Sequence, residues 1–84
     1  MALVLLPGLL AAEAGGRKRL ELDAATLGEA LRALPVADLV LDEHGAVRSL
    51  VHVYVDGERA HDLTTLVGER SRIRIVAAIA GGAL

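Results

Sequence analysis

This 84-residue chain contains 11 Asp and Glu residues and 3 His residues, but their spacing indicates no active site. Cysteine is absent, so there is no thiolate nucleophile, disulfide or cysteine-based zinc site. The i, i+4 helical spacing of a metal-binding pair is not found among His44, His52 and His61. No Ser-His-Asp set or carboxylate pair has a spacing that would build an active site. We therefore expect no metal site, no bound cofactor and no catalytic residue within the chain.

Two features near the C-terminus remain, and each has a plain alternative. Gly81 and Gly82 form a pair just before the end of the sequence, where chain ends are commonly mobile and without a role. Arginines alternate at positions 70, 72 and 74. Most such clusters are solvated, although alternate arginines also suit an acidic partner surface.

The length and composition limit the classes of function. We expect one domain over residues 1–84, because a core of this size has no material for a second. The chain is 54% hydrophobic with Tyr54 as its single aromatic residue, which predicts an aliphatic core. A net charge of -2 and the lack of Phe and Trp argue against binding to nucleic acid.

The apolar segment from Ala2 to Ala14 has some features of a secretory signal, including Ala12-Glu13-Ala14 as a cleavage-like site. No Lys or Arg precedes this segment, however, and Pro7-Gly8 interrupts it. No segment has the roughly 20 apolar residues that a membrane span needs. We therefore expect a cytoplasmic protein.

The first third of the chain predicts a hairpin followed by a helix. Residues 2–6 form an apolar strand, and residues 17–23 alternate in polarity as a half-buried strand does, with Gly15-Gly16 in the connection. Thr26 begins a helix that should stop near Leu34, since Pro35 follows. We expect the Thr26 hydroxyl to accept from the Glu29 amide and the Glu29 carboxylate to reach back to the Thr26 amide.

The remainder predicts a loop and three strands. Residues 36–47 form a crossover loop with at most one irregular turn, and residues 50–55 form a central strand that ends in a turn at Asp56-Gly57. Residues 63–67 favour a short edge strand, and residues 72–78 a last strand. This is an α+β order, with one helix across one face of a mixed sheet. The predicted core comprises Leu20, Leu22, Leu27, Leu31, Val51, Val53, Val55, Ile73 and Ile75.

Five short motifs occur in order along the chain: V-L-L-P-G-L-L at 4–10, A-T-L-G-E-A-L-R-A-L at 25–34, D-E-H-G at 42–45, V-H-V-Y-V-D-G-E at 51–58 and I-A-G-G at 79–82. Together they resemble the ThiS/MoaD family of ubiquitin-like sulfur carriers, over essentially the whole chain. The resemblance implies a β-grasp fold with a mixed sheet of four to five strands and a flexible Gly-Gly tail at residues 79–84.

The resemblance also implies a function. Family members carry sulfur as a thiocarboxylate on a C-terminal glycine, so Gly82 is the expected attachment site and Gly81 part of the tail. An adenylating enzyme that uses ATP activates the carboxylate, and sulfide then displaces AMP. Glycine suits this position because it lacks a Cβ and passes through a narrow enzyme channel.

Two residues depart from the family pattern, in which the chain usually stops at Gly-Gly. Here Ala83 and Leu84 follow, so Gly82 is in a peptide bond. Some carriers for cysteine or sulfur-containing metabolites have such a tail, and a JAMM-type zinc metalloprotease removes it. The resemblance thus implies processing between Gly82 and Ala83. A thiamin sulfur carrier, the small subunit of molybdopterin synthase and a noncovalent β-grasp interaction module remain alternatives.

A docking surface for partner enzymes is expected on the sheet. A helix covers only one face of a β-grasp sheet, so the other face meets solvent, and a tyrosine among aliphatic side chains and arginines matches the composition of interface hot spots. The predicted docking residues are Leu6, His52, Tyr54, Arg74 and Val76. The alternative is an ordinary solvated sheet face.

Overall fold

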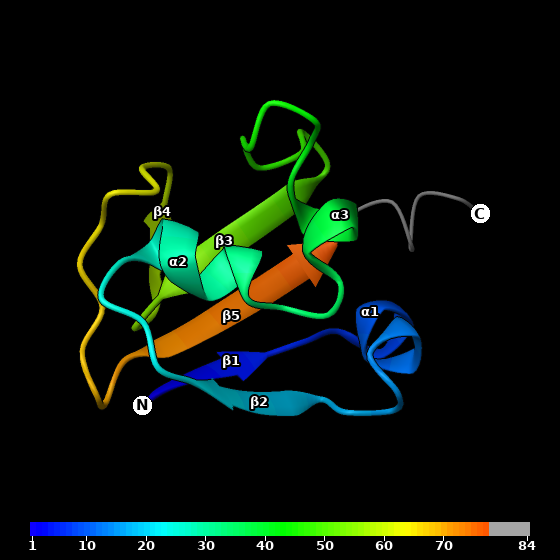
Figure 1. The fold of residues 1–84 in the computed structure, drawn as a ribbon, viewed down its shortest axis with the longest axis horizontal. Helices are drawn as coiled ribbons and strands as arrows, with labels where there is room; N and C mark the ends of the chain where they lie inside the picture. Colours follow the sequence, from blue (N-terminus) through cyan, green and yellow to red (C-terminus); the bar gives the residue numbers. More distant parts are fainter. Residues whose placement is uncertain (78–84) are drawn as a thin grey trace.

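The computed structural model describes residues 1–77 of the chain. They form a five-stranded mixed sheet with strand order β2-β1-β5-β3-β4 and helices against one face (Figure 1). Strands β1 and β5 pair in parallel, and the other neighbours are antiparallel. This is the predicted α+β, ubiquitin-like β-grasp arrangement. The last strand, β5 (Arg72–Ala77), lies in the middle of the sheet, so the prediction that residues 50–55 form the central strand was wrong.

The opening hairpin is confirmed, but its connection contains a helix that was not predicted. Strands β1 (Ala2–Leu5) and β2 (Arg19–Leu22) pair antiparallel, and α1 (Gly8–Glu13) lies between them. Pro7 takes the N-cap position, which its fixed φ suits. Gly15 and Gly16 follow the helix with φ of 76° and 85°, and the Gly16 amide donates to the Ala11 carbonyl. The helix buries Leu10 and Ala11 in the core.

The predicted helix is α2 (Leu27–Arg32), and its N-terminus is capped nearly as expected. The Glu29 amide donates to the Thr26 hydroxyl over 3.2 Å. The Glu29 carboxylate accepts from the amide of Ala25 over 3.0 Å, one residue before the expected Thr26. The buried side of the helix comprises Leu27, Ala30 and Leu31. Within the described residues, a third short helix, α3 (Ala37–Val40), is the one turn allowed for the crossover.

The cap gives a stability prediction. Replacing Thr26 by Ala removes the acceptor for the Glu29 amide, so we expect the free energy of unfolding to fall by about 1 kcal/mol. Urea denaturation followed by circular dichroism measures this loss. Thr26→Ser keeps the hydroxyl and should retain most of the stability, and equal losses in both variants would contradict the capping role.

The edge of the sheet opposite β2 is built by a tight hairpin. Strands β3 (Val51–Val55) and β4 (Glu58–Ala60) are joined by Asp56 and Gly57, whose φ values of 51° and 89° are both positive. Positive φ at both central residues is typical of the type I′ turn that the Asp-Gly pair predicts. Because β4 follows directly, it forms the edge of the sheet beside β3.

The prediction that residues 63–67 form a short edge strand was wrong. This segment joins the start of α2 instead of the sheet: the Leu27 amide donates to Thr65, the Gly28 amide to Leu63, and Val67 donates to Ala25. A side chain at Gly28 would approach the Leu63 carbonyl to 3.2 Å, so glycine lets the segment pack closely against the helix. Val67 is buried and Leu63 packs against the core, whereas Leu66 is 79% exposed.

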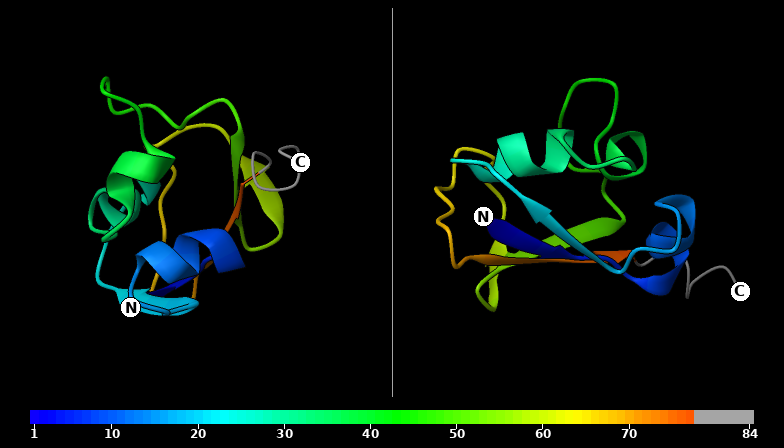
Figure 2. Two further views of the ribbon diagram at one scale, coloured as in Figure 1. Left: turned by 90° about the vertical axis from the view of Figure 1, so that its right-hand side faces the viewer. Right: turned by 60° about the horizontal axis from the view of Figure 1, so that its bottom comes forward.

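The core lies between the sheet and the helix layer. Figure 2 shows α2 and α3 on one side of the sheet and no helix on the other. Of the predicted core residues, seven are buried, and Leu22 and Val55 are partly buried against the same cluster. The helix α1 contributes Leu10 and Ala11 to that cluster. One face of the sheet is thereby left uncovered. Within residues 1–77, no helix is long and apolar enough to cross a membrane.

Candidate functional site

The uncovered face of the sheet, here called the open face, is built by strand alternation. Val51 and Val53 of β3 point to the core, so His52 and Tyr54 point the other way and are half-buried. In β5, Ile73 and Ile75 are buried, whereas Arg72, Arg74 and Val76 are exposed. The open face comprises Leu3, Leu5, Arg19, Glu21, His52, Tyr54, Arg59, Arg72, Arg74 and Val76.

The strand registers place five of these residues in one row across the sheet. Arg19 lies opposite Leu5, Leu5 beside Arg74, Arg74 opposite Tyr54, and Tyr54 opposite Arg59. Tyr54 and Leu5 thus lie between arginines from β2, β5 and β4. His52 and Val76 lie opposite each other in a neighbouring row. Four of the predicted docking residues therefore share this face.

The prediction that Leu6, the fifth residue, belongs to the docking surface was wrong. Leu6 is 6% exposed and belongs to the core, together with Ala2 and Val4. Residues of one parity share a face of β1, so Leu3 and Leu5 are the ones that meet solvent. Odd-numbered and even-numbered residues of this segment are all apolar, so no sequence pattern distinguishes the buried side from the exposed one.

A pocket lies on the open face, beside the turn between β3 and β4. It is lined by Leu5, Tyr54, Asp56, Arg72, Arg74 and Val76, together with Gly57. The Asp56 carboxylate accepts from the Arg72 amide over 2.9 Å, and the Asp56 amide donates to the Arg72 carbonyl, which fixes the β3–β4 turn against β5. Of the open-face residues, the prediction omitted Leu3, Leu5, Arg19, Glu21, Arg59 and Arg72. The alternation of arginines at 70, 72 and 74 was the signal that pointed to Arg72.

The charge of the open face differs in sign from that of the whole chain. Arg19, Arg59, Arg72 and Arg74 are exposed on it, against the carboxylates of Glu21 and Asp56, although the chain carries a net charge of -2. A basic rim around apolar side chains and one tyrosine suits an acidic partner surface with an apolar centre.

Two carboxyl groups with shifted pKa values lie in loops and have structural causes. The pKa of Asp42 is lowered because its carboxylate accepts from the amides of Ala46 and His44. The pKa of Asp62 is lowered by bonds from the Thr64 amide and hydroxyl. Hydrogen bonds within turns thus account for both shifts. Among residues 1–77, no group of three or more His, Cys, Asp or Glu side chains is arranged to hold a metal ion.

The predicted attachment and processing residues Gly81, Gly82 and Ala83 lie outside the described residues. In the sequence they follow β5, which ends at Ala77, and three residues separate Ala77 from Gly81. The strand that leads to the tail is the one that carries Arg72, Arg74 and Val76 of the open face.

Comparison with known proteins identifies the family. The sequence profile of the ThiS family matches residues 4–82. The chain belongs to the ThiS family. This membership confirms the predicted resemblance and gives the coarse functional class, a ubiquitin-like sulfur carrier. No curated protein sequence matches the chain.

Three solved structures of similar proteins support the fold. CysO from Mycobacterium tuberculosis superposes with a TM-score of 0.82 at 23% identity, covering 93% of this chain and 99% of that one. The BexX/CysO complex of Amycolatopsis orientalis contains a chain that matches with a TM-score of 0.80 at 25% identity, covering 98% and 100%. SAMP1 from Haloferax volcanii gives 0.72 at 28% identity, covering 90% and 92%.

Proposed function

We propose that this protein carries sulfur as a thiocarboxylate on Gly82, which a partner adenylating enzyme forms at the expense of ATP. The chain is the substrate of that enzyme and is itself no enzyme, and ATP binds to the partner. The acceptor is an enzyme of cysteine or sulfur-metabolite biosynthesis, in keeping with the short tail Ala83-Leu84.

The observation that carries this proposal is where the family match ends. The match runs from residue 4 through residue 82, so it includes Gly81-Gly82 and excludes Ala83 and Leu84. A chain whose family resemblance stops at the second glycine is expected to use that glycine as its terminus. Three residues separate the last described strand, β5, from this glycine pair in the sequence.

The proposed chemistry has two steps. A carboxylate resists nucleophiles, so the Gly82 carboxylate first attacks the α-phosphorus of ATP, which forms an acyl adenylate and releases pyrophosphate. A sulfide sulfur then attacks the Gly82 carbonyl carbon; the new C–S bond replaces the C–O bond to phosphate, and AMP leaves. No electron transfer is required when the sulfur donor supplies sulfide.

The open face supports the docking half of the proposal. It combines Tyr54, Leu5 and Val76 with four exposed arginines, and no helix of residues 1–77 covers it. We propose that the adenylating enzyme binds here through a surface with acidic groups around an apolar centre. Because β5 belongs to this face and leads toward the tail, binding here would present the C-terminus to the partner.

The test is intact-protein mass spectrometry. A chain that ends at Gly82, incubated with a cognate adenylating enzyme, ATP and a sulfide donor, is expected to gain the mass of sulfur replacing one oxygen. Omission of ATP is expected to abolish the gain. Failure of the ATP-containing reaction to add sulfur would contradict the proposal.

The matched control changes only the terminal residue. In the same truncated chain, Gly82→Ala leaves residues 1–77 untouched but adds a methyl group at the reacting position. We expect normal folding by circular dichroism and poor sulfur incorporation, because the side chain restricts backbone freedom and access to a narrow channel.

A further inference from the structure

The strand β2 presents a free backbone edge. It is the outermost strand of the sheet and pairs only with β1 within residues 1–77. The Leu6 amide donates to the Lys18 carbonyl over 2.8 Å, so the backbone groups of Lys18 point toward β1. In an antiparallel pair the backbone groups of every second residue point the same way, so those of Leu20 and Leu22 also point toward β1. The backbone groups of Arg19 and Glu21 therefore point outward, away from the sheet.

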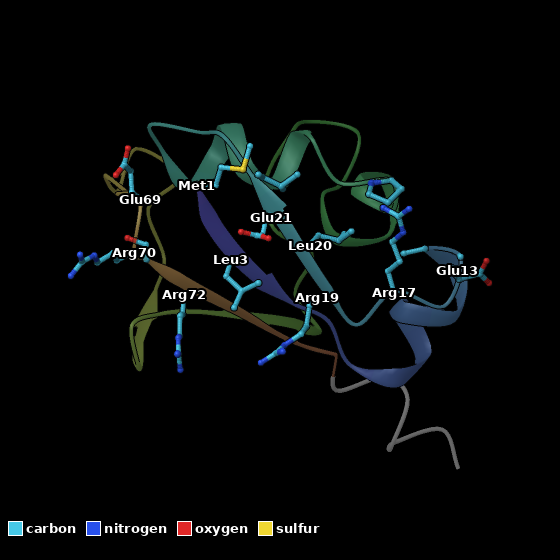
Figure 3. A pocket seen from close by; sticks show the side chains of 15 residues that line it. Met1, Leu3, Glu13, Arg17, Arg19, Leu20, Glu21, Glu69, Arg70 and Arg72 are labelled. Carbon is cyan, nitrogen blue, oxygen red and sulfur yellow. The ribbon is translucent and has the colours of Figure 1, made fainter.

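An independent contact agrees with this assignment. The Leu3 amide donates to the Ser71 carbonyl on the β5 side, over 3.0 Å, so Leu3 directs its backbone away from β2. Leu3 lies opposite Glu21, which makes this a pair without mutual hydrogen bonds. A pocket beside this strand is lined by Arg17, Arg19 and Glu21, and also by Leu3 of β1 and Arg72 of β5 (Figure 3).

The charges along this edge change sign around Leu20. Arg17 and Arg19 precede it, and Glu21 and Asp23 follow it at the same spacings. When two identical strands pair antiparallel about Leu20, Arg19 of each lies opposite Glu21 of the other, and Arg17 opposite Asp23. Opposite charges directly across an antiparallel pair are stabilising.

We propose that two copies of this protein associate through antiparallel pairing of their β2 strands, centred on Leu20. In this register Arg19 and Glu21 form the hydrogen-bonded pair, as their outward backbone groups require. Leu20 lies opposite Leu20, and Lys18 opposite Leu22, on the side of the sheet that faces the helices. The inference does not depend on the sulfur-carrier function.

The neighbouring registers are less favourable. A shift that centres the pairing on Glu21 places two carboxylates opposite each other, and a shift that centres it on Arg19 places two guanidinium groups opposite each other. A pairing centred between two residues, such as Leu20 opposite Glu21, would place the helix layers of the two copies on opposite faces of the sheet. The backbone groups of Leu20 point toward β1 and could not bond to the outward groups of Glu21. Charged side chains on an edge strand usually prevent pairing with other strands. A second copy of β2 in antiparallel orientation is an exception, because it places acidic residues opposite the arginines.

The partners would form one continuous sheet. A two-fold axis perpendicular to the sheet relates antiparallel strands, so both open faces lie on the same side of the dimer and both helix layers on the other. Only short strands of four residues meet, so the buried area is below that of stable complexes. We expect a dissociation constant on the order of 100 μM to 1 mM.

Sedimentation equilibrium and NMR of the full-length, ¹⁵N-labelled protein test the association. Between about 50 μM and 2 mM, the weight-average mass is expected to rise toward that of a dimer, and the amide signals of Arg19 and Glu21 to shift with concentration. These amides point outward, so their shifts separate strand pairing from other contacts. High salt is expected to weaken the association by screening the charge pairs.

Charge exchange tests the register. Either Arg19→Glu or Glu21→Arg alone places like charges opposite each other and should weaken association about tenfold. Mixing the two variants restores opposite charges at both sites, and the double variant Arg19→Glu/Glu21→Arg restores them within one chain. Arg59→Glu, the matched charge reversal on the other edge strand, should leave association unchanged.

Three results would overturn the proposal. These are a chain that stays monomeric at the highest concentration, association that Arg19→Glu does not weaken, and a mixture of the two single variants that associates no better than either alone. Circular dichroism of each variant verifies its fold, and both changed side chains are exposed in the present structure.

Discussion

The full-length chain, incubated with the adenylating enzyme, ATP and a sulfide donor, is expected to gain no sulfur, whereas the chain ending at Gly82 gains it. Ala83 and Leu84 place the Gly82 carbonyl in an amide, and an amide has no carboxylate oxygen to attack ATP. Intact-protein mass spectrometry of both forms under identical conditions measures the difference. The effect is all-or-none, since removal of two residues creates the reacting group.

A cognate zinc metalloprotease of the JAMM type is expected to rescue the full-length chain. The protease would cleave between Gly82 and Ala83, and its metal would supply the activated water for amide hydrolysis. A zinc chelator added before the protease should abolish the rescue, while the truncated chain should still react when the chelator is added to it. Equal sulfur incorporation by the unprocessed and truncated chains would show that Gly82 need not become a terminus.

The sequence predicted the elements whose local pattern is set by backbone chemistry. The Thr26 cap, the Asp56-Gly57 turn and the alternation of β3 are each determined by residues close together in the chain, and all three are found. The sequence did not reveal that Gly8–Glu13 forms a helix, because a Pro-Gly pair such as Pro7-Gly8 also indicates a turn that ends a strand. Nor did it place β5 at the centre, which depends on its parallel pairing with β1 at the other end of the chain.

The candidate site was predicted on β3 and β5 but not on β1. Polar and apolar residues alternate in β5, so the exposed parity of Arg74 could be read directly. Every residue from Ala2 to Leu6 is apolar, so only the structure distinguishes buried Leu6 from half-buried Leu5. The row from Arg19 to Arg59 likewise required the register of all five strands, which no local pattern specifies.

Tyr54→Ala is expected to weaken binding to the adenylating enzyme by about 1 to 3 kcal/mol, as truncation of an interface aromatic typically does. Tyr54 lies at the centre of the open face, opposite Arg74 and Arg59 and beside the pocket lined by Leu5 and Val76. Calorimetric titration of the enzyme with the chain that ends at Gly82 measures the loss. Because Tyr54 is only half-buried, its replacement should cost little folding stability, which urea denaturation verifies.

The matched control and a charge reversal locate the interface. Leu39→Ala removes a similarly exposed apolar side chain from α3, on the helix side of the molecule, and should leave the affinity unchanged. Arg74→Glu should weaken binding and also reduce its dependence on salt, because it removes a positive charge that faces an acidic partner. Unchanged affinity in Tyr54→Ala, or equal losses in Tyr54→Ala and Leu39→Ala, would refute docking through the open face. The enzyme would then have to bind another surface of the chain to load sulfur on Gly82. The two proposals stay distinguishable, because truncation at Gly82 tests the reacting terminus and Tyr54→Ala tests only where the enzyme binds.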